Sequence, residues 1–378
     1  MGDTLAYRKI EKKLLLYRNT QYGRKIMAKI KIEELKSFSK KALLYAGVRE
    51  EDANTVVDTL VTTDEFGVLS HGTKNLYQYI QKMQEGGLDA KAEPTIEAEG
   101  PAWAIINGNA AIGMVSSCKA MNLAIEKAKQ CGIGYVGVKN SCHFGAAGYY
   151  ANLAAKAGML GISMSNADPN MAIPNSSDVA IGNNPFSFAA PLKNGKTVFL
   201  DIALSIVAAL KVVMAREKGI SVPDTWLIDN EGQPTTDPSG FPYESHLMPM
   251  ASHKGYGLAI MVEILTSVIT GSGMLSEVTS WNLDLKSRNN AGHAFIAIDI
   301  SKMIPMELFE ERIERMINEL KNAPKAKHAE QIFVPGEMEW AKFEAAEERG
   351  WIELTEAMVE NMENLSKMTG TPVQWLED

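Results

Sequence analysis

Apolar residues recur at helical spacing near both ends of the chain and in shorter runs through its middle. The helical spacing predicts terminal helices over residues 32–46, 50–63, 71–83 and 306–320, with two more after residue 337. The shorter runs predict strands, which we place at residues 102–106, 110–112, 133–138, 159–164, 186–190, 197–201 and 294–299. Further helices are expected at residues 114–130, 144–157, 206–218 and 258–270.

This order of elements predicts an α/β protein with two parts. Residues 91–300 are expected to form a central mixed-sheet α/β domain. Residues 27–90 and 301–378, from opposite ends of the chain, are expected to form a helical domain packed against it. Residues 1–26 are basic with only a short apolar cluster, so we expect a loosely attached extension or residues that precede a true start at Met27.

Turn residues predict how some of these strands connect. Asn107-Gly108 predicts a hairpin between the first two expected strands, and Asn194-Gly195 predicts a turn between strands five and six. Residues 221–250 are rich in turn formers and are expected to be mostly loop.

Three glycines, Gly132, Gly134 and Gly137, match the spacing of the dinucleotide-binding fingerprint G-x-G-x-x-G. In a Rossmann fold these glycines follow a strand and open a helix. Here they follow an expected helix and run into an expected strand. The fold is therefore predicted not to be a Rossmann fold.

His143 occupies a polar turn, Asn-Ser-Cys-His-Phe-Gly-Ala-Ala-Gly-Tyr-Tyr at residues 140–150, between an expected strand and an expected helix. Ligands of α/β sheets bind at such turns, and a helix N-terminus there favours anions. Small residues next to the histidine would let a flat ligand lie against the backbone; they are Gly145, Ala146, Ala147 and Gly148. The alternative is that His143 only caps the turn.

A second histidine, His71, opens the third expected helix. If that helix begins near His71, then His71, Asn75 and Tyr79 share one face. This row could line a pocket or form a wet stripe on a surface helix. Ser70 lacks a G-x-S-x-G context, which argues against a serine hydrolase.

Two further charged residues stand at the ends of expected elements. Lys254 lies among glycines at a helix start, a common phosphate or carboxylate site, although a solvated lysine in a glycine-rich bend fits equally well. Asp201 closes an apolar strand and could cap a helix or accept a sugar hydroxyl.

Composition excludes several classes of protein. The net charge of −8 argues against nucleic acid as a partner. The chain has 3 cysteines without metal-ligand spacing, which suits a reducing cytoplasm and predicts neither a disulfide framework nor a metal site. The apolar run after Leu258 is interrupted by Glu263, so no membrane span is expected. A histidine can move a hydroxyl proton while hydride leaves the adjacent carbon, which indicates a small-molecule enzyme with a cofactor. From the cysteine usage and the lack of a membrane span, we expect this enzyme to be cytoplasmic.

These motifs together resemble the malate/L-lactate dehydrogenase family of the non-Rossmann type, which includes ureidoglycolate, sulfolactate and diketogulonate dehydrogenases or reductases. The resemblance extends over residues 27 to about 350. The matching residues, in family order, are Asp64 with Ser70-His-Gly72, residues 140–150, Gly182-Asn-Asn-Pro185, Asp201-Ile-Ala-Leu-Ser205, Lys254-Gly-Tyr-Gly-Leu258, Gly292-His293 and Pro335-Gly-Glu337.

The resemblance implies a homodimer or higher oligomer that binds NAD(P) in an extended form and acts on a small molecule. His71 would exchange a proton with the substrate oxygen with support from Ser70, and His143, beside the nicotinamide, is the other candidate. The resemblance implies that the cofactor is held by His143, Phe144, Gly145, Ala146, Ala147, Asp201, Ile202, Ala203, Lys254, Gly255, Pro335, Gly336 and Glu337. Glu337 should repel a 2′-phosphate, so NAD is predicted in preference to NADP.

One departure from the family concerns the substrate. Many members carry an arginine four residues after the motif histidine, whereas this chain has Asn75. Asparagine supplies no charge, so Lys74 or Lys139 would have to take over, or the substrate differs. Asn183 also stands where the family often has a hydroxyl residue. The expected substrate contacts are therefore Asn75, Tyr79, Lys139 and Asn183.

The sequence thus predicts NAD-dependent hydride transfer between a 2-hydroxy acid and a 2-oxo acid, with malate first and lactate or sulfolactate next. The alternatives are an NADPH-dependent reductase of a cyclic imine or keto sugar acid, a ureidoglycolate dehydrogenase, and a catalytically idle ligand-binding homologue.

Overall fold

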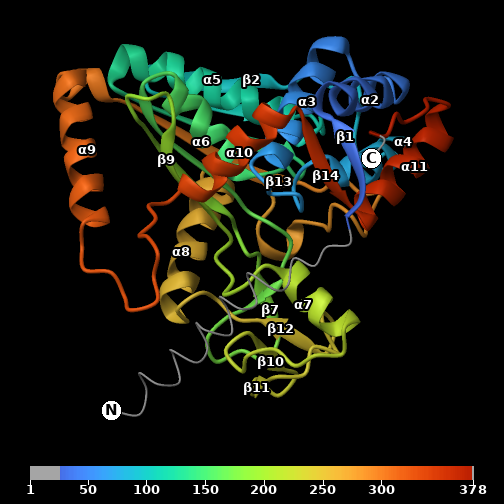
Figure 1. Ribbon diagram of the computed structural model, residues 1–378. Helices are drawn as coiled ribbons and strands as arrows, with labels where there is room; N and C mark the ends of the chain where they lie inside the picture. The colour runs from blue at the N-terminus through green and yellow to red at the C-terminus, as the bar shows by residue number, and fades with distance from the viewer. Residues whose placement is uncertain (1–25, 377–378) are drawn as a thin grey trace.

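A seven-stranded mixed sheet lies at the centre of the molecule, with its strands in the order β2-β3-β4-β13-β5-β8-β9 (Figure 1). The computed structural model describes residues 26–376. The strands of this sheet are β2 (Thr95–Gly100), β3 (Trp103–Asn107), β4 (Ile133–Ser141), β5 (Met159–Ser165), β8 (Phe186–Pro191), β9 (Thr197–Ile202) and β13 (Ala291–Asp299). Only β3 and β4 pair in parallel; the other neighbours are antiparallel. The expected mixed α/β fold is confirmed.

Glycines allow helices to lie close to both faces of this sheet. On one face, α5 (Gly113–Cys131) covers β4, where a Cβ on Gly134 would lie 2.2 Å from the backbone oxygen of Ala124. On the other face, a Cβ on Gly137 would lie 2.5 Å from the methyl group of Thr270. Gly132, with φ of 86°, ends α5. The three fingerprint-like glycines therefore serve helix packing and a helix end, and the rejection of a Rossmann fold is confirmed.

The remaining helices lie around the sheet and near the chain ends. They are α2 (Ile32–Tyr45), α3 (Glu50–Glu65), α4 (Leu76–Gln84), α6 (Ala147–Lys156), α7 (Ala209–Glu217), α8 (His253–Glu263), α9 (Met306–Lys321), α10 (Glu337–Arg349) and α11 (Glu356–Thr369). Helix α8 continues into a π-helical turn, η2 (Ile264–Val268), and shorter 3₁₀ turns are η1 (Thr73–Asn75), η3 (Leu275–Glu277) and η4 (Ile300–Lys302). Within residues 26–376, no helix is long and apolar enough to cross a membrane.

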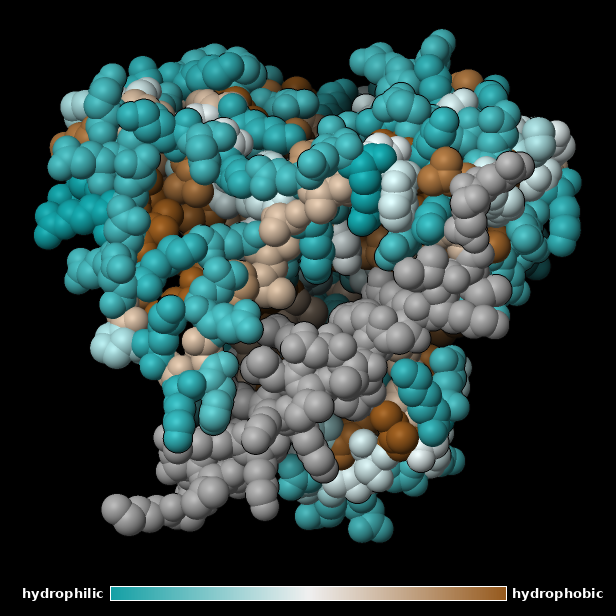
Figure 2. Space-filling model, viewed as in Figure 1, coloured by the Kyte–Doolittle hydropathy of each residue, from teal (hydrophilic) through white to brown (hydrophobic). Residues whose placement is uncertain are grey.

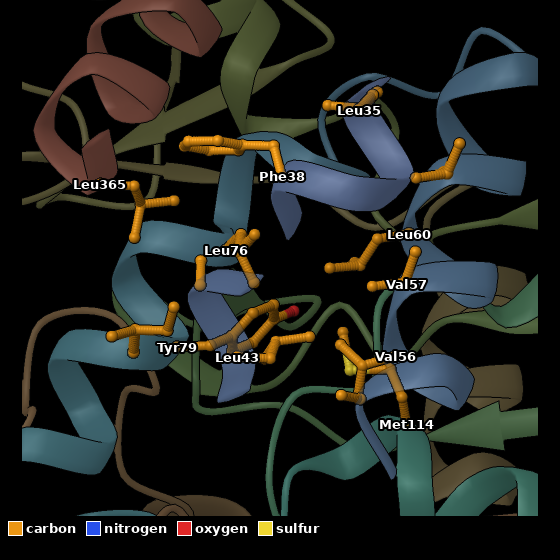
Figure 3. Close-up of a cluster of buried hydrophobic side chains, with 14 of the residues drawn as sticks. Leu35, Phe38, Leu43, Val56, Val57, Leu60, Leu76, Tyr79, Met114 and Leu365 are labelled. Atoms are coloured by element: carbon orange, nitrogen blue, oxygen red, sulfur yellow. The ribbon is translucent and has the colours of Figure 1, made fainter. Parts of the chain in front are cut away.

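Helices from both ends of the chain share one hydrophobic core, as the sequence predicts. Phe38 of α2, Leu60 of α3, Leu76 of α4 and Leu365 of α11 are all buried in it (Figure 3). Burying each such side chain contributes about 1.5–3 kcal/mol relative to leaving it in water.

The terminal part also contains strands that the hydropathy pattern did not predict. β1 (Ile26–Lys31) pairs antiparallel with β14 (Trp351–Thr355), with Ile30 opposite Ile352. The pairing joins segments more than 300 residues apart, which no local pattern in the sequence indicates. The expected extension over residues 1–26 lies almost wholly outside the described residues.

A second, smaller sheet includes short strands from the loop-rich residues 221–250. Its strands follow the order β11-β10-β12-β6-β7, and it lies with α7 at the bottom of Figure 1. The strands are β6 (Met171–Ala172), β7 (Val179–Ile181), β10 (Leu227–Asp229), β11 (Pro234–Thr235) and β12 (Ser245–Leu247). They have 2 or 3 residues each, too few for a periodic pattern. Three of them, β10, β11 and β12, lie within residues 221–250, which otherwise form turns and loops as expected.

The prediction of a hairpin at Asn107-Gly108 is wrong. β3 pairs with β2 before it, and residues 110–112 form no strand. Asn109 and Ala110 have φ values of 54° and 61°, and the chain then enters α5 directly. The turn at Asn194-Gly195 does connect antiparallel strands, β8 and β9.

Candidate active site

The turn that carries His71 is folded around the carboxylate of Asp64. Oδ2 of Asp64, at the end of α3, accepts hydrogen bonds from the N–H of Thr73 at 2.9 Å and from its hydroxyl at 2.6 Å. A Cβ on Gly72 would lie 1.9 Å from Oδ1 of Asp64, so only glycine fits there. This buried carboxylate fixes the backbone on which His71 sits.

His71 lies before the helix rather than in it, which corrects the expected row of three side chains. Residues 73–75 form η1 and α4 begins only at Leu76. Asn75 is 5% exposed, and its side-chain amide donates to the backbone oxygen of Ser70 at 2.9 Å. Asn75 therefore stabilises the turn through the backbone of Ser70. Of the expected row, only Tyr79 contacts His143.

Four rings from three separate segments meet at His143. His71 lies with its ring centre 5.6 Å from that of His143, and Tyr79 shares a hydrogen bond with Nδ1 of His143. Trp281 stacks on His143 with ring centres 4.3 Å apart and planes 13° apart. The sequence did not predict Trp281, which stands in a loop without any recognisable motif.

His143 lies in a turn, as predicted, although its helix starts later than expected. α6 begins at Ala147 rather than residue 144, so the histidine stands four residues before the helix. Phe144 points away, into the core, where it is 2% exposed and stacks on His293. The side chain of Phe144 therefore cannot contact a cofactor; only its backbone can.

Both histidines have one engaged and one open nitrogen. Nδ1 of His71 is 2.8 Å from the hydroxyl of Ser70, and Nδ1 of His143 bonds Tyr79. No described residue hydrogen-bonds to Nε2 of either ring. Burial, with the charge of Lys74, lowers the pKa of His71 to about 4, and burial lowers the pKa of His143 well below its ordinary value. Both imidazoles are therefore neutral at pH 7, and in the tautomer with its proton on Nδ1 each ring can accept a proton at Nε2.

Hydrogen bonds join the segments that were expected to hold the cofactor. Oδ2 of Asp201 accepts from the N–H of Gly148 at 2.8 Å, which ties the end of β9 to the start of α6. Phe199 donates to the backbone oxygen of Pro335 at 3.2 Å, which brings residues 335–337 to the same strand. Burial raises the pKa of Asp201 to about 6. The turn that leads into α6, the end of β9 and residues 335–337 therefore lie together.

The start of α8 joins the same region through Leu204. The N–H of Leu204 donates to the backbone oxygen of Asn183, and its own oxygen accepts from Met250, each at 2.8 Å. The N–H of Gly255 then donates to the backbone oxygen of Met250 at 2.9 Å. This chain of contacts places Asn183 and the first turn of α8, with its exposed Lys254, next to residues 201–203.

Two expected site residues are engaged in ion pairs. Lys139 on β4 pairs with Glu97 on β2 at 2.6 Å. Glu337 bonds Lys321 through Oε1, and its Oε2 accepts from the N–H of Val334 at 3.1 Å. Within residues 26–376, no His, Cys, Asp and Glu side chains form a group that could hold a metal ion.

Neutral imidazoles beside a turn of small residues are compatible with a dehydrogenase that acts on a CH–OH group, in which a histidine moves the hydroxyl proton. Residues 30–363 match the family model of malate/L-lactate dehydrogenase. The chain belongs to this family, as its motifs indicated.

Named relatives support the assignment. The chain is 37% identical over 345 residues to malate dehydrogenase of Pyrococcus abyssi, covering 89% of this chain and 94% of that protein. It is 35% identical to ureidoglycolate dehydrogenase (NAD(+)) of Escherichia coli, over 82% of this chain and 88% of the relative. The sulfolactate dehydrogenase structure from Methanocaldococcus jannaschii superposes with a TM-score of 0.85 at 33% identity, covering 91% of this chain and 98% of that one.

The names of the relatives differ in cofactor. In contrast to the Escherichia coli protein, (2R)-3-sulfolactate dehydrogenase (NADP(+)) of Chromohalobacter salexigens is 30% identical over 71% of this chain and 80% of its own. A nicotinamide cofactor therefore follows from the family, and the choice between NAD and NADP does not.

Proposed function

We propose that this protein is an NAD-dependent dehydrogenase of a small 2-hydroxy acid, with malate as the first candidate and lactate or sulfolactate next. The observation that carries the proposal is the pair of neutral histidines, His71 and His143, with open Nε2 atoms and ring centres 5.6 Å apart. In this proposal His71 takes the hydroxyl proton and Ser70 orients its ring. An anionic substrate would raise the low pKa of His71, because a nearby negative charge favours the imidazolium.

The residues at the joined segments fit a dinucleotide. Gly148 lets the carboxylate of Asp201 reach the backbone at the start of α6, since a Cβ there would lie 2.8 Å from Oδ2. Asp201 placed in this way can accept a ribose hydroxyl. Lys254, exposed in the first turn of α8, can meet a pyrophosphate. When bound, the nicotinamide supplies or accepts the hydride. The backbone contacts would come from Phe144, Gly145, Ala146, Ala147, Ile202, Ala203, Gly255, Pro335 and Gly336.

For the substrate carboxylate we propose Lys74 rather than Lys139. The charge of Lys74 acts on His71, where it adds to the effect of burial in lowering the pKa of the ring, and Lys139 has no such effect on His71. Lys74→Met should raise KM for a 2-oxo acid, and Lys139→Met should leave it nearly unchanged. Equal effects of the two variants would contradict this choice.

The first test is the loss of NADH absorbance with a panel of 2-oxo acids, repeated with NADPH. Turnover of oxaloacetate or pyruvate with NADH supports the proposal. If no simple 2-oxo acid is turned over, and a cyclic imine or keto sugar acid is reduced with NADPH, the reductase alternative would replace this proposal. Oxidation of ureidoglycolate by NAD would point to the third candidate.

Selectivity for NAD is tested at Glu337 and its partner Lys321. The ion pair between them offsets the charge that should repel a 2′-phosphate. Glu337→Gln should therefore raise kcat/KM for NADPH relative to NADH, and Lys321→Met should lower it. If neither variant changes this ratio, Glu337 does not select the cofactor.

We also propose a homodimer that associates through α8 and η2. Large apolar side chains are exposed along this stretch, including Ile264 at 45% and Val268 at 53%. Figure 2 shows that such patches interrupt an otherwise hydrophilic surface. Such a patch on a folded protein marks an interaction surface. Light scattering should give twice the chain mass for the native protein and a monomer for Ile264→Lys.

A further inference from the structure

Trp281 lies in a loop, residues 280–288, whose two ends are joined by hydrogen bonds from Thr279. The N–H of Thr279 donates to the backbone oxygen of Asn289 at 3.1 Å, and its hydroxyl donates to that of Arg288 at 3.0 Å. These bonds hold the two ends of the loop together, so that its placement depends on what holds its tip.

The tip of the loop is attached to α4 by Lys82. Lys82 is 0% exposed, and its ammonium group donates to the backbone oxygens of Asp284 and, at 2.7 Å, of Ser287. Burial lowers the pKa of Lys82. A cation out of water is costly, and these two carbonyl oxygens offset part of that cost. Such a side chain holds the loop firmly because the lysine has no alternative contact with solvent.

Gly87, just after α4, forms the surface against which the loop rests. A Cβ on Gly87 would lie 2.4 Å from the backbone oxygen of Leu285 and 2.8 Å from that of Ser287. Any side chain here would push the loop away from α4. The hydrogen bonds from Lys82 and the close approach to Gly87 together fix the position of the loop.

Helix α4 thus contacts His143 in two ways. Tyr79 bonds Nδ1 of His143 directly, and Lys82, one turn later, holds the loop whose Trp281 stacks on the same ring. Trp281 also stacks on Tyr79, with ring centres 5.1 Å apart. A large rigid side chain placed there limits the space beside His143.

We propose that Lys82 is a positioning residue that keeps Trp281 stacked on His143, and that Trp281 sets the largest substrate that can approach this histidine. The limit on substrate size rests on the proposed function. The attachment of the loop by Lys82 does not.

Limited trypsin digestion tests the attachment without any substrate. Lys286 and Arg288 are exposed cleavage sites on the loop. Lys82→Met removes both hydrogen bonds, so cleavage at these sites should become at least about tenfold faster. Gly87→Ala should have the same effect because its Cβ would lie within 3 Å of the backbone oxygens of Leu285 and Ser287 and of the Lys82 ammonium group, so the contact between loop and α4 must open.

Lys127 provides the matched control. It is also buried, at 7% exposed, and donates to the backbone oxygen of Gly100 and to Glu99, each at 2.8 Å. Lys127→Met should destabilise the protein without faster cleavage at Lys286. If the control accelerates cleavage equally, or if Lys82→Met leaves it unchanged in folded protein, the attachment is disproved.

Kinetics with a compact and a branched 2-oxo acid test the size limit. Trp281→Leu should shift the ratio of kcat/KM toward the branched acid by about tenfold. Lys82→Met should shift it in the same direction, and the double variant should shift it no further than Trp281→Leu alone, because both act through one ring. Additive shifts, or no shift, would overturn the proposal. A wild-type protein inactive on every 2-oxo acid would instead contradict the proposed function and leave the digestion result valid.

Discussion

His143 and His293 are both desolvated imidazoles stacked on an aromatic ring, yet only one keeps a nitrogen open. His143 stacks on Trp281 at 4.3 Å, and His293 stacks on Phe144 at 4.6 Å. Burial lowers the pKa of both rings, that of His293 to about 3. By stacking and pKa alone the two are equivalent.

Their hydrogen bonds separate them. Nδ1 of His293 lies 2.9 Å from the hydroxyl of Ser165, and its Nε2 lies 2.8 Å from that of Ser141. His293 is thus saturated by neighbouring strands, whereas His143 bonds only Tyr79 among the described residues. The low pKa of each ring therefore follows from its burial, and what separates the two is that Nε2 of His143 is left without a partner among the described residues and can exchange a proton with a substrate.

The strongest test of this comparison replaces the open imidazoles. His71→Asn and His143→Asn should each keep the fold, and the one that moves the proton should lose about 10²–10⁴-fold in single-turnover hydride transfer. The smaller loss identifies the residue that only orients substrate or cofactor. If both variants keep the native rate, neither histidine is the acid–base group.

The saturated histidine should respond in the opposite way. His293→Asn leaves the hydroxyls of Ser141 and Ser165 without their ring partner, at a cost of about 1–3 kcal/mol in the free energy of unfolding. Urea denaturation measures this loss. The kcat of the folded protein should change little, and a loss of kcat as large as that of His143→Asn would break the comparison.

Acid should destabilise the protein through these same rings. The pKa of His71 is about 4 and that of His293 about 3, both below the ordinary value of 6.5 that the unfolded chain would show. The unfolded state therefore binds more protons below pH 6.5, and stability falls as pH decreases from 6.5 toward 4. The slope approaches about 1.4 kcal/mol per pH unit for each fully linked histidine. His293→Asn should flatten the curve measured by urea denaturation at several pH values.

Tyr79→Phe should give the smallest change. It removes the hydroxyl that bonds Nδ1 of His143 and keeps the ring that packs against Trp281. The loss of one hydrogen bond of about 0.5–1.5 kcal/mol should lower kcat several-fold at most. A large fall in kcat would mean that Tyr79 itself takes part in proton transfer.

Periodicity predicted the elements that are long enough to repeat. The central strands β4, β5, β8, β9 and β13 and the helices α2, α3 and α5 all lie where apolar spacing placed them. The rejection of the glycine fingerprint was confirmed, because the sequence showed that a helix precedes Gly134 and a strand follows it. The strands of the small sheet have too few residues to repeat and were missed.

The sequence by itself determined the mixed α/β class, the turn that carries His143 and the motifs that place the chain in its family. These features are local, because they depend on apolar periodicity and on residues close together in the chain. Only the tertiary structure showed that Asn75 supports the turn of His71, that Phe144 points into the core, that Trp281 stacks on His143, and that Lys82 bonds the loop of Trp281. Such contacts join segments up to about 200 residues apart, as Lys82 and Ser287 show. Their partners are selected by packing and by the cost of burying unsatisfied polar groups, which leave no periodic signal in a single sequence.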